Sequence, residues 1–133
     1  MDAGLVQRVR QRANDVCEYC RMPQAVHLLT FPIDHVIARQ HGGEMDLENL
    51  ALSSVRCNSF KGPNIAGLDP ESGELTRLFH PRTDIWEEHF EVRQAYIHGQ
   101  TAVGRTTVVV LNMNHSDYVA LRESIILEGR FPG

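Results

Sequence analysis

The chain has 133 residues, enough for one compact domain, and its 42% hydrophobic and 23% charged residues are typical of a folded globular protein. The longest uninterrupted aliphatic run, residues 108–111, is far shorter than the roughly 20 apolar residues needed to span a bilayer, which excludes a membrane-spanning protein. Lys and Arg number 13 against 17 Asp and Glu, and the net charge of −4 argues against a protein held to nucleic acid by electrostatics alone.

The first residues and the cysteine count indicate the compartment. Residues 1–12 contain three arginines and lack an apolar stretch followed by a small-residue cleavage site, so they do not resemble a secretory signal. We therefore expect a cytoplasmic protein. Three cysteines in such a chain favour metal binding or plain packing over a disulfide framework.

The first half of the chain predicts short strands between two helices, because apolar residues recur at helical spacing near the start and in short β-type runs later. Cys17 and Cys20 have the spacing of a metal-binding knuckle. The expected elements are a helix over 5–13, strands over 28–31 and 33–38 interrupted by Pro32, a polar loop over 41–48, a strand over 50–52, and a helix of about two turns from Ser53 or Ser54 to Gly62.

The second half carries structural signals only. Turn residues and apolar runs alternate there without a spacing typical of ligands or catalytic groups. The expected elements are a turn at 69–73 before a strand over 75–79, a hairpin of 90–92 with 95–97, and helices over 102–112 and 117–128.

Five polar residues of the first half have catalytic potential. Asp34 and His35 are adjacent on the first expected strand, Asn49 begins the second, and Asn58 and Lys61 lie three apart on the next helix. Each alone would be an ordinary residue. Carboxylate and amide oxygens suit Mg²⁺ or Mn²⁺, and imidazole is a natural general base. Because strand neighbours point to opposite faces, Asp34 and His35 can share a site only if the strand ends or bulges there.

In this order, and behind the cysteine pair, these residues resemble the HNH endonuclease family. The resemblance covers residues 17–62 and implies an α+β fold in one domain, 1–133. A ββα-metal, treble-clef-like core would occupy about 5–63, and a hairpin with two helices would form a C-terminal extension over about 64–133. The matching residues are Cys17, Cys20, Ile33 to Ile37, Gly42, Gly43, Asn49 to Leu52, Cys57, Asn58, Lys61 and Gly62.

The resemblance implies metal-dependent hydrolysis of phosphodiester bonds in DNA, with no small-molecule cofactor. His35 would take a proton from water, while a Mg²⁺ or Mn²⁺ ion on Asp34 and Asn58 would stabilise the phosphate and the leaving group. Asn49 would hold the backbone that orients His35, and Lys61 could pair with a phosphate oxygen. The family often has His where this chain has Asn58, and a neutral amide favours the harder ions.

The zinc site of the family is incomplete in this sequence. Members with structural zinc carry two cysteine pairs, and the partner of Cys57 would stand at position 54, which is Ser54. A serine hydroxyl is a poor zinc ligand, so a four-cysteine site cannot form. Zn²⁺ could be held by Cys17, Cys20 and Cys57 with His27 or water. Alternatively, the cysteines could pack as small apolar residues, with Ser54 serving as the helix N-cap.

Two functions remain in competition. The first is a DNA endonuclease or nickase, and the second is a catalytically silent zinc-knuckle module that binds nucleic acid on the same scaffold. The missing fourth cysteine and the acidic net charge favour the second, whereas retention of all five polar residues favours the first. Residues 1–62 carry seven positive and seven negative side chains, and residues 63–133 carry six and ten. A divalent ion at Asp34 would therefore make the first half net positive, so we expect weak, metal-dependent and salt-sensitive DNA binding.

Overall fold

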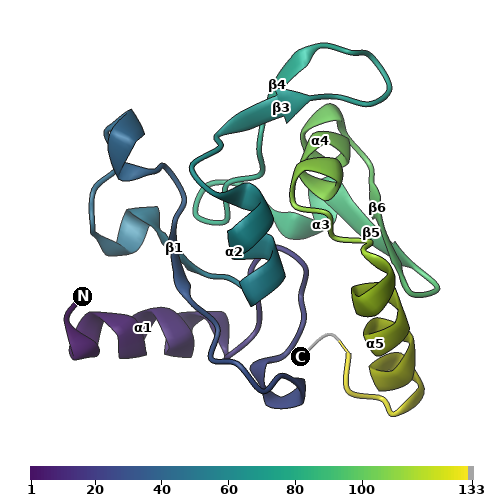
Figure 1. The fold of residues 1–133 in the computed structure, drawn as a ribbon, viewed down its shortest axis with the longest axis horizontal. Helices are drawn as coiled ribbons and strands as arrows, with labels where there is room; N and C mark the ends of the chain where they lie inside the picture. The colour runs from purple at the N-terminus through teal and green to yellow at the C-terminus, as the bar shows by residue number, and fades with distance from the viewer. Residues whose placement is uncertain (132–133) are drawn as a thin grey trace.

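The computed structural model describes residues 1–131, whose strands pair into three antiparallel two-stranded sheets (Figure 1). No helix in this range is long and apolar enough to cross a membrane. The helices are α1 (Ala3–Ala13), α2 (Val55–Lys61), α3 (Trp86–His89), α4 (Ala102–Val110) and α5 (Ser116–Leu127). The strands are β1 (Ile33–His35), β2 (Leu50–Leu52), β3 (Ala66–Leu68), β4 (Leu75–Arg77), β5 (Phe90–Arg93) and β6 (Tyr96–Gly99), and short 3₁₀ turns cover Gln24–Val26, Arg39–His41 and Leu47–Asn49.

The strand, loop, strand and short helix order expected for the core is confirmed, as is the α+β class. Ile33 of β1 pairs with Leu52 of β2, and His35 pairs with Leu50. Ser54 caps α2, because its hydroxyl accepts a hydrogen bond from the Cys57 amide at 3.2 Å. This ββα unit lies at the centre of the molecule (Figure 1).

The strand expected over residues 28–31 is absent, and that prediction was wrong. The side chain of Gln24 donates to the Leu29 carbonyl at 3.0 Å and accepts from the Phe31 amide at 2.7 Å. One side chain thus satisfies the backbone groups that a neighbouring strand would otherwise pair with. The strand expected over 33–38 is shortened to β1, because Asn49 takes the backbone groups of Ile37.

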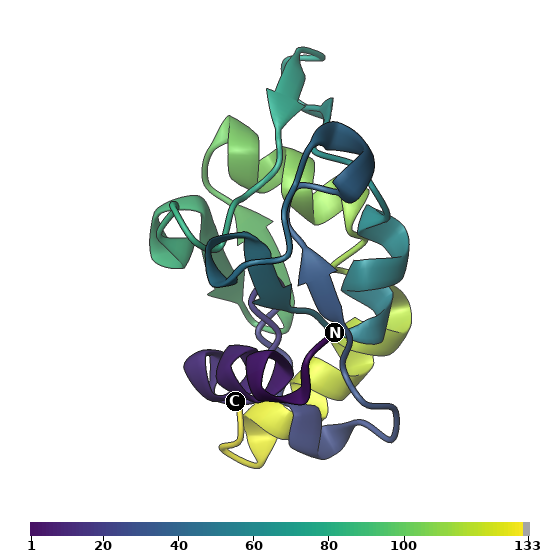
Figure 2. The same cartoon turned by 90° about the vertical axis from the view of Figure 1, so that its left-hand side faces the viewer.

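The extension contains the expected β5–β6 hairpin and the two expected helices, α4 and α5. The strand expected over 75–79 forms as β4, which pairs with β3 in a second hairpin; β3 and the short helix α3 were not predicted. The β3–β4 hairpin packs against α4, where a side chain at Gly67 would come within 2.5 Å of Val110. Figures 1 and 2 show this hairpin at the opposite end of the molecule from α1.

One continuous cluster of buried apolar side chains joins the core to the extension. Trp86 of α3 packs on Phe90 with ring centroids 5.1 Å apart, and its indole N–H donates to the Tyr19 carbonyl at 2.7 Å. At the other side, the Arg12 guanidinium of α1 donates to the carbonyls of Leu47 and Leu50 at 2.7 and 2.6 Å. The extension is therefore packed directly on the segment that contains the cysteine pair.

Candidate catalytic groove and cysteine cluster

An open groove of about 370 Å³ lies where the end of β1 meets α2. Three of the predicted site residues, Asp34, His35 and Asn58, line it together. The strand ends at His35, which is the condition under which two adjacent residues can face one site. The complete lining is Ile33, Asp34, His35, Ala38, Arg39, Asn58, Gly62 and Pro63.

The Asp34 carboxylate is held by two buried donors. Its Oδ2 accepts from the Tyr19 hydroxyl at 2.7 Å and lies 3.2 Å from Lys61 Nζ, while its Oδ1 lies 3.3 Å from the same Nζ. Burial raises the pKa of Asp34, and Lys61 and Tyr19 oppose that rise because both stabilise the charged form. With only 5% of Asp34 exposed, these contacts fix the orientation of its carboxylate.

Lys61 does not lie where a phosphate could reach it, contrary to our expectation. Only 1% of the residue is exposed, and Nζ also donates to the His35 carbonyl at 3.2 Å. A buried ammonium needs a counter-charge. Lys61, in the last turn of α2, therefore points into the protein and forms an ion pair with the Asp34 carboxylate. Lys61 therefore connects α2 to β1 from beneath the groove.

Asn49 fastens the backbone that follows His35. Its side chain accepts from the Ile37 amide at 2.9 Å and donates to the carbonyls of Ile37 and Glu44 at 3.0 and 2.9 Å. The neighbouring Gly43 allows this approach, because a Cβ there would lie 1.7 Å from the Ile37 carbonyl oxygen. The Nε2 atom of the His35 imidazole is buried and has no hydrogen-bond partner among residues 1–131.

The three cysteines form one buried cluster. Cys17, Cys20 and Cys57 are fully buried free thiols whose Sγ atoms all lie within 4.8 Å of one another. Burial acts to raise the pKa of Cys17, but hydrogen bonds from the other two thiols hold this pKa well below its usual value. Burial also raises the pKa of Cys20, to about 12. The hydroxyl of Ser54 lies 3.6 Å from the Cys20 sulfur, on the side where a fourth cysteine would stand.

His27 is not part of this cluster. Its Nδ1 lies 3.0 Å from the Pro23 carbonyl oxygen, and its ring packs edge-on against Phe31 and Tyr118, with centroids 5.0 and 5.6 Å away. In the described part of the chain, the group of close metal-ligating side chains around the cysteines contains no histidine. The structure therefore leaves Ser54 or water as the neutral group beside the three sulfurs.

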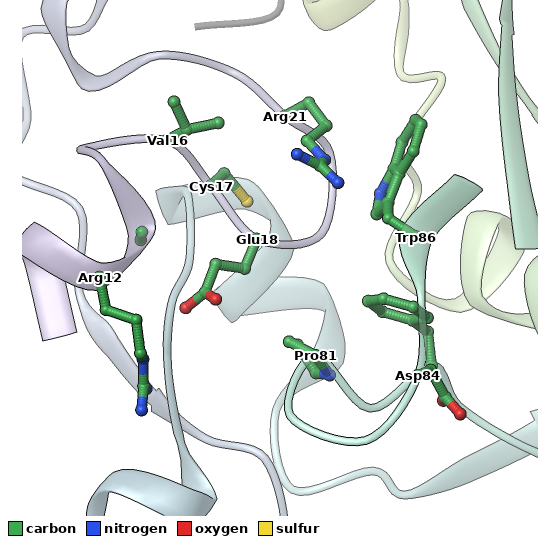
Figure 3. Close-up of a pocket in the computed structure, with 10 residues that line it drawn as sticks. Arg12, Val16, Cys17, Glu18, Arg21, Pro81, Asp84 and Trp86 are labelled. Atoms are coloured by element: carbon green, nitrogen blue, oxygen red, sulfur yellow. The ribbon is translucent and has the colours of Figure 1, made fainter. Parts of the chain in front are cut away.

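A second cavity, of about 190 Å³, borders the other side of Cys17 between the end of α1 and the segment before α3 (Figure 3). Its charged side chains already have partners. Arg21 pairs with Glu87 at 3.1 Å, and Glu18 pairs with Arg82. This cavity holds none of the residues expected in the catalytic site, so the groove at β1 and α2 is the better candidate.

Two residues at the groove were missed from the sequence. Tyr19 lies between the two knuckle cysteines, and no local pattern indicated that its hydroxyl would reach Asp34. Arg39, in the 3₁₀ turn after β1, lines the groove with an exposed side chain. In the sequence, only the position of Arg39, four residues after His35, could have indicated that it lies at the groove.

Comparison with known proteins agrees with the geometry. A model of the HNH endonuclease family matches residues 17–64, a range that contains the cysteine cluster and the five predicted catalytic residues. No curated protein and no solved structure gives a significant match to the chain. The match supports the assignment of residues 17–64, about a third of the chain, to the HNH endonuclease family.

Proposed function

We propose that this protein is a divalent-metal-dependent DNA endonuclease that hydrolyses phosphodiester bonds in the groove between β1 and α2. The observation that carries the proposal is that Asp34, His35 and Asn58 line one groove inside the family domain. DNA is the substrate that we infer from the family, and the reaction should leave 5′-phosphate and 3′-hydroxyl ends.

The donors at the groove fit Mg²⁺ or Mn²⁺. The carboxylate of Asp34 and the amide oxygen of Asn58 are hard oxygen ligands, and both residues border the same open space. When bound, such an ion supplies a Lewis acid for the charge that develops on the phosphate and the leaving oxygen. Tyr19 and Lys61 would keep the Asp34 carboxylate in the orientation that this role requires.

His35 is the residue that we assign to take the proton from the attacking water. A neutral imidazole nitrogen can accept a proton from water and pass it on, which is the part of a general base. Asn49 would act as a positioning residue, because its three hydrogen bonds fix the loop that follows His35. The ring could then approach the phosphate without a large rearrangement of the backbone.

We further propose that Cys17, Cys20 and Cys57 bind Zn²⁺. Three buried free thiols within 4.8 Å of one another fit three positions of a tetrahedral zinc site. The ion would link the knuckle before β1 to the start of α2, and so support the scaffold rather than the chemistry. Chelation should therefore lower the temperature of unfolding.

Plasmid nicking in Mg²⁺ or Mn²⁺ tests the assignment of His35. We expect His35→Ala to lose about 10²-fold or more of the nicking rate, which is the range for removal of a general base. His98→Ala is the matched control, because His98 is exposed on β6 and takes no part in the groove. If His35→Ala nicks as fast as the parent protein, the assigned base is wrong.

Calorimetric titration with DNA distinguishes the nuclease from the silent binding module. The nuclease proposal expects DNA engagement that depends on the divalent ion, followed by turnover. Tight binding without any divalent ion, together with no cleavage in its presence, would instead support a zinc-knuckle module that only binds nucleic acid.

A further inference from the structure

The Lys61 ammonium lies on both oxygens of the carboxylate that we assign to the catalytic ion. Its Nζ is 3.3 Å from Oδ1 of Asp34 and 3.2 Å from Oδ2, and it also donates to the His35 carbonyl at 3.2 Å. Lys61 is 1% exposed and Asp34 is 5% exposed, so little water screens the pair. A cation of the chain itself thus already stands at the candidate metal ligand.

The groove offers a divalent ion little negative charge. Among the described residues that line it, Asp34 is the one carboxylate, Asn58 is neutral and Arg39 is positive. The buried ammonium of Lys61 balances the charge of Asp34. Proteins usually hold Mg²⁺ with one or two carboxylates together with phosphate groups of the substrate. The negative charge that this groove lacks is therefore one that a phosphate could supply.

Lys61 cannot leave the pair without opening the core. It stands in the last turn of α2, and its contacts with Asp34 and the His35 carbonyl join that turn to β1. An ion that binds Asp34 would therefore share the carboxylate with a fixed positive charge. Repulsion between two cations at short range is strong where water is excluded. Arg39 differs, because its side chain is exposed and solvent screens its charge.

We propose that Lys61 is an internal counter-ion that competes with the divalent ion for Asp34, so that the free protein binds the ion weakly and a DNA phosphate completes the site. This inference rests on the proposed function. The alternative is a structural role, in which Lys61 only joins α2 to β1. The two roles predict opposite effects, because removal of a competitor strengthens ion binding, whereas loosening of the site weakens it.

Calorimetric Mn²⁺ titration of charge variants without DNA separates the two roles. Lys61→Gln removes the charge and keeps a hydrogen-bond donor toward Asp34, so it should bind Mn²⁺ at least about tenfold more tightly than the parent protein. The titrations are run at about pH 8, so that a proton does not replace Lys61 on the carboxylate. Arg39→Gln is the matched control. It removes an exposed positive charge from the same groove and should change the affinity by less than about threefold.

The intact Lys61 gives a second readout. Because it is the only lysine, isotopically labelled lysine yields one side-chain magnetic resonance signal, that of the candidate counter-ion. Addition of Mg²⁺ should shift this signal. A short DNA duplex should lower the Mg²⁺ concentration at half-saturation by at least about tenfold, because phosphate and ion favour each other's binding. The titration with duplex uses His35→Ala, so that the DNA is not cut.

Each outcome decides the proposal. Unchanged or weaker Mn²⁺ binding by Lys61→Gln overturns it, as does an equal gain in Lys61→Gln and Arg39→Gln. If Lys61→Gln does not fold, the Lys61 signal decides: a shift with Mg²⁺ that the duplex strengthens supports the competition, and a signal that does not respond refutes it.

Failure of this inference is distinguishable from failure of the proposed function. A parent protein that nicks DNA while Lys61→Gln gains no affinity for Mn²⁺ refutes the competition alone. Tighter Mn²⁺ binding by Lys61→Gln, together with a parent protein that does not nick DNA, would refute the nuclease and leave the competition for Asp34 standing.

Discussion

A single hydroxyl connects the cysteine cluster with the catalytic groove. Tyr19 is placed by the knuckle turn between Cys17 and Cys20, and its hydroxyl donates to Asp34 from a fully buried position. Burial and the neighbouring Asp34 carboxylate raise the pKa of Tyr19 well above its usual value. The phenol therefore remains a donor throughout the physiological range.

Tyr19→Phe should slow DNA nicking by about tenfold at saturating Mg²⁺, because Asp34 would keep only Lys61 and lose its fixed orientation. Loss of one buried hydrogen bond should also cost about 1 kcal/mol of folding stability. Nicking rates across a Mg²⁺ titration measure the first effect and denaturant unfolding measures the second. Tyr96→Phe, at an exposed position on β6, is the control. An unchanged rate in Tyr19→Phe would show that the hydroxyl does not position Asp34.

Among the elements, those that carry the motif were predictable from local sequence. The end of β1 at His35 and the capping of α2 by Ser54 depend on residues close in the chain. The β3 strand was missed because residues 66–68 include no β-branched side chain and depend on packing against α4.

The candidate site was also predictable only in part, because some of its contacts depend on nearby residues and others on packing between distant elements. Asp34, His35 and Asn58 could be assigned to one site because their order and spacing resemble those of the HNH endonuclease family. The contact of Tyr19 with Asp34 could not, because it depends on how the turn between the two cysteines packs on β1. The sequence also could not show that Lys61 points into the protein, because this depends on the position of the Asp34 carboxylate beneath α2.

Arg105 of α4 anchors the β3–β4 hairpin through ion pairs with Asp69 and, at 3.4 Å, with Glu71. Arg105 donates to both carboxylate oxygens of Asp69, at 3.0 and 2.8 Å, and Asp69 also accepts from the amide of Glu71 and the hydroxyl of Ser72. Hydrogen bonds from Arg105 hold the pKa of Asp69 well below its usual range. The pair therefore stabilises the folded state most when Asp69 is ionised.

The Asp69–Arg105 pair should make the stability of the folded state depend on pH. A carboxyl group with a lowered pKa contributes stability above its unfolded value of about 3.9, and the contribution is lost as the pH falls below that value. Asp69→Asn should therefore lower the unfolding temperature at pH 7 and bring it closer to that of the parent at the lowest pH values. Glu123→Gln, at an exposed position on α5, should leave the pH profile unchanged. A constant difference between Asp69→Asn and the parent at every pH would contradict this account.

At the scale of the whole molecule, charge is divided unevenly between the two halves of the chain. The family domain is nearly neutral by count, and the extension carries the acidic excess. Within residues 1–131, Arg39 forms no salt bridge, and its exposed side chain borders the groove. Under the proposed function, it is the cation best placed to meet a DNA phosphate beside the candidate catalytic residues.

Arg39→Ala should weaken DNA binding uniformly across sequences and reduce the slope of log affinity against log salt by about one, as expected when one phosphate contact is lost. Fluorescence anisotropy with a short duplex at several salt concentrations measures both quantities. Arg93→Ala is the control, because Arg93 lies on β5 and already pairs with Glu91. An identical slope for Arg39→Ala and the parent would remove Arg39 from the DNA interface.

The burial of Lys61 has a consequence for the chemistry of the protein surface. Because Lys61 is the only lysine and is 1% exposed, the folded chain presents no lysine amine to acylating reagents or acetylating enzymes. Its charge beneath the groove is thereby protected from covalent neutralisation as long as α2 stays docked on β1. Acylation of this one side chain would therefore report how often the catalytic core opens.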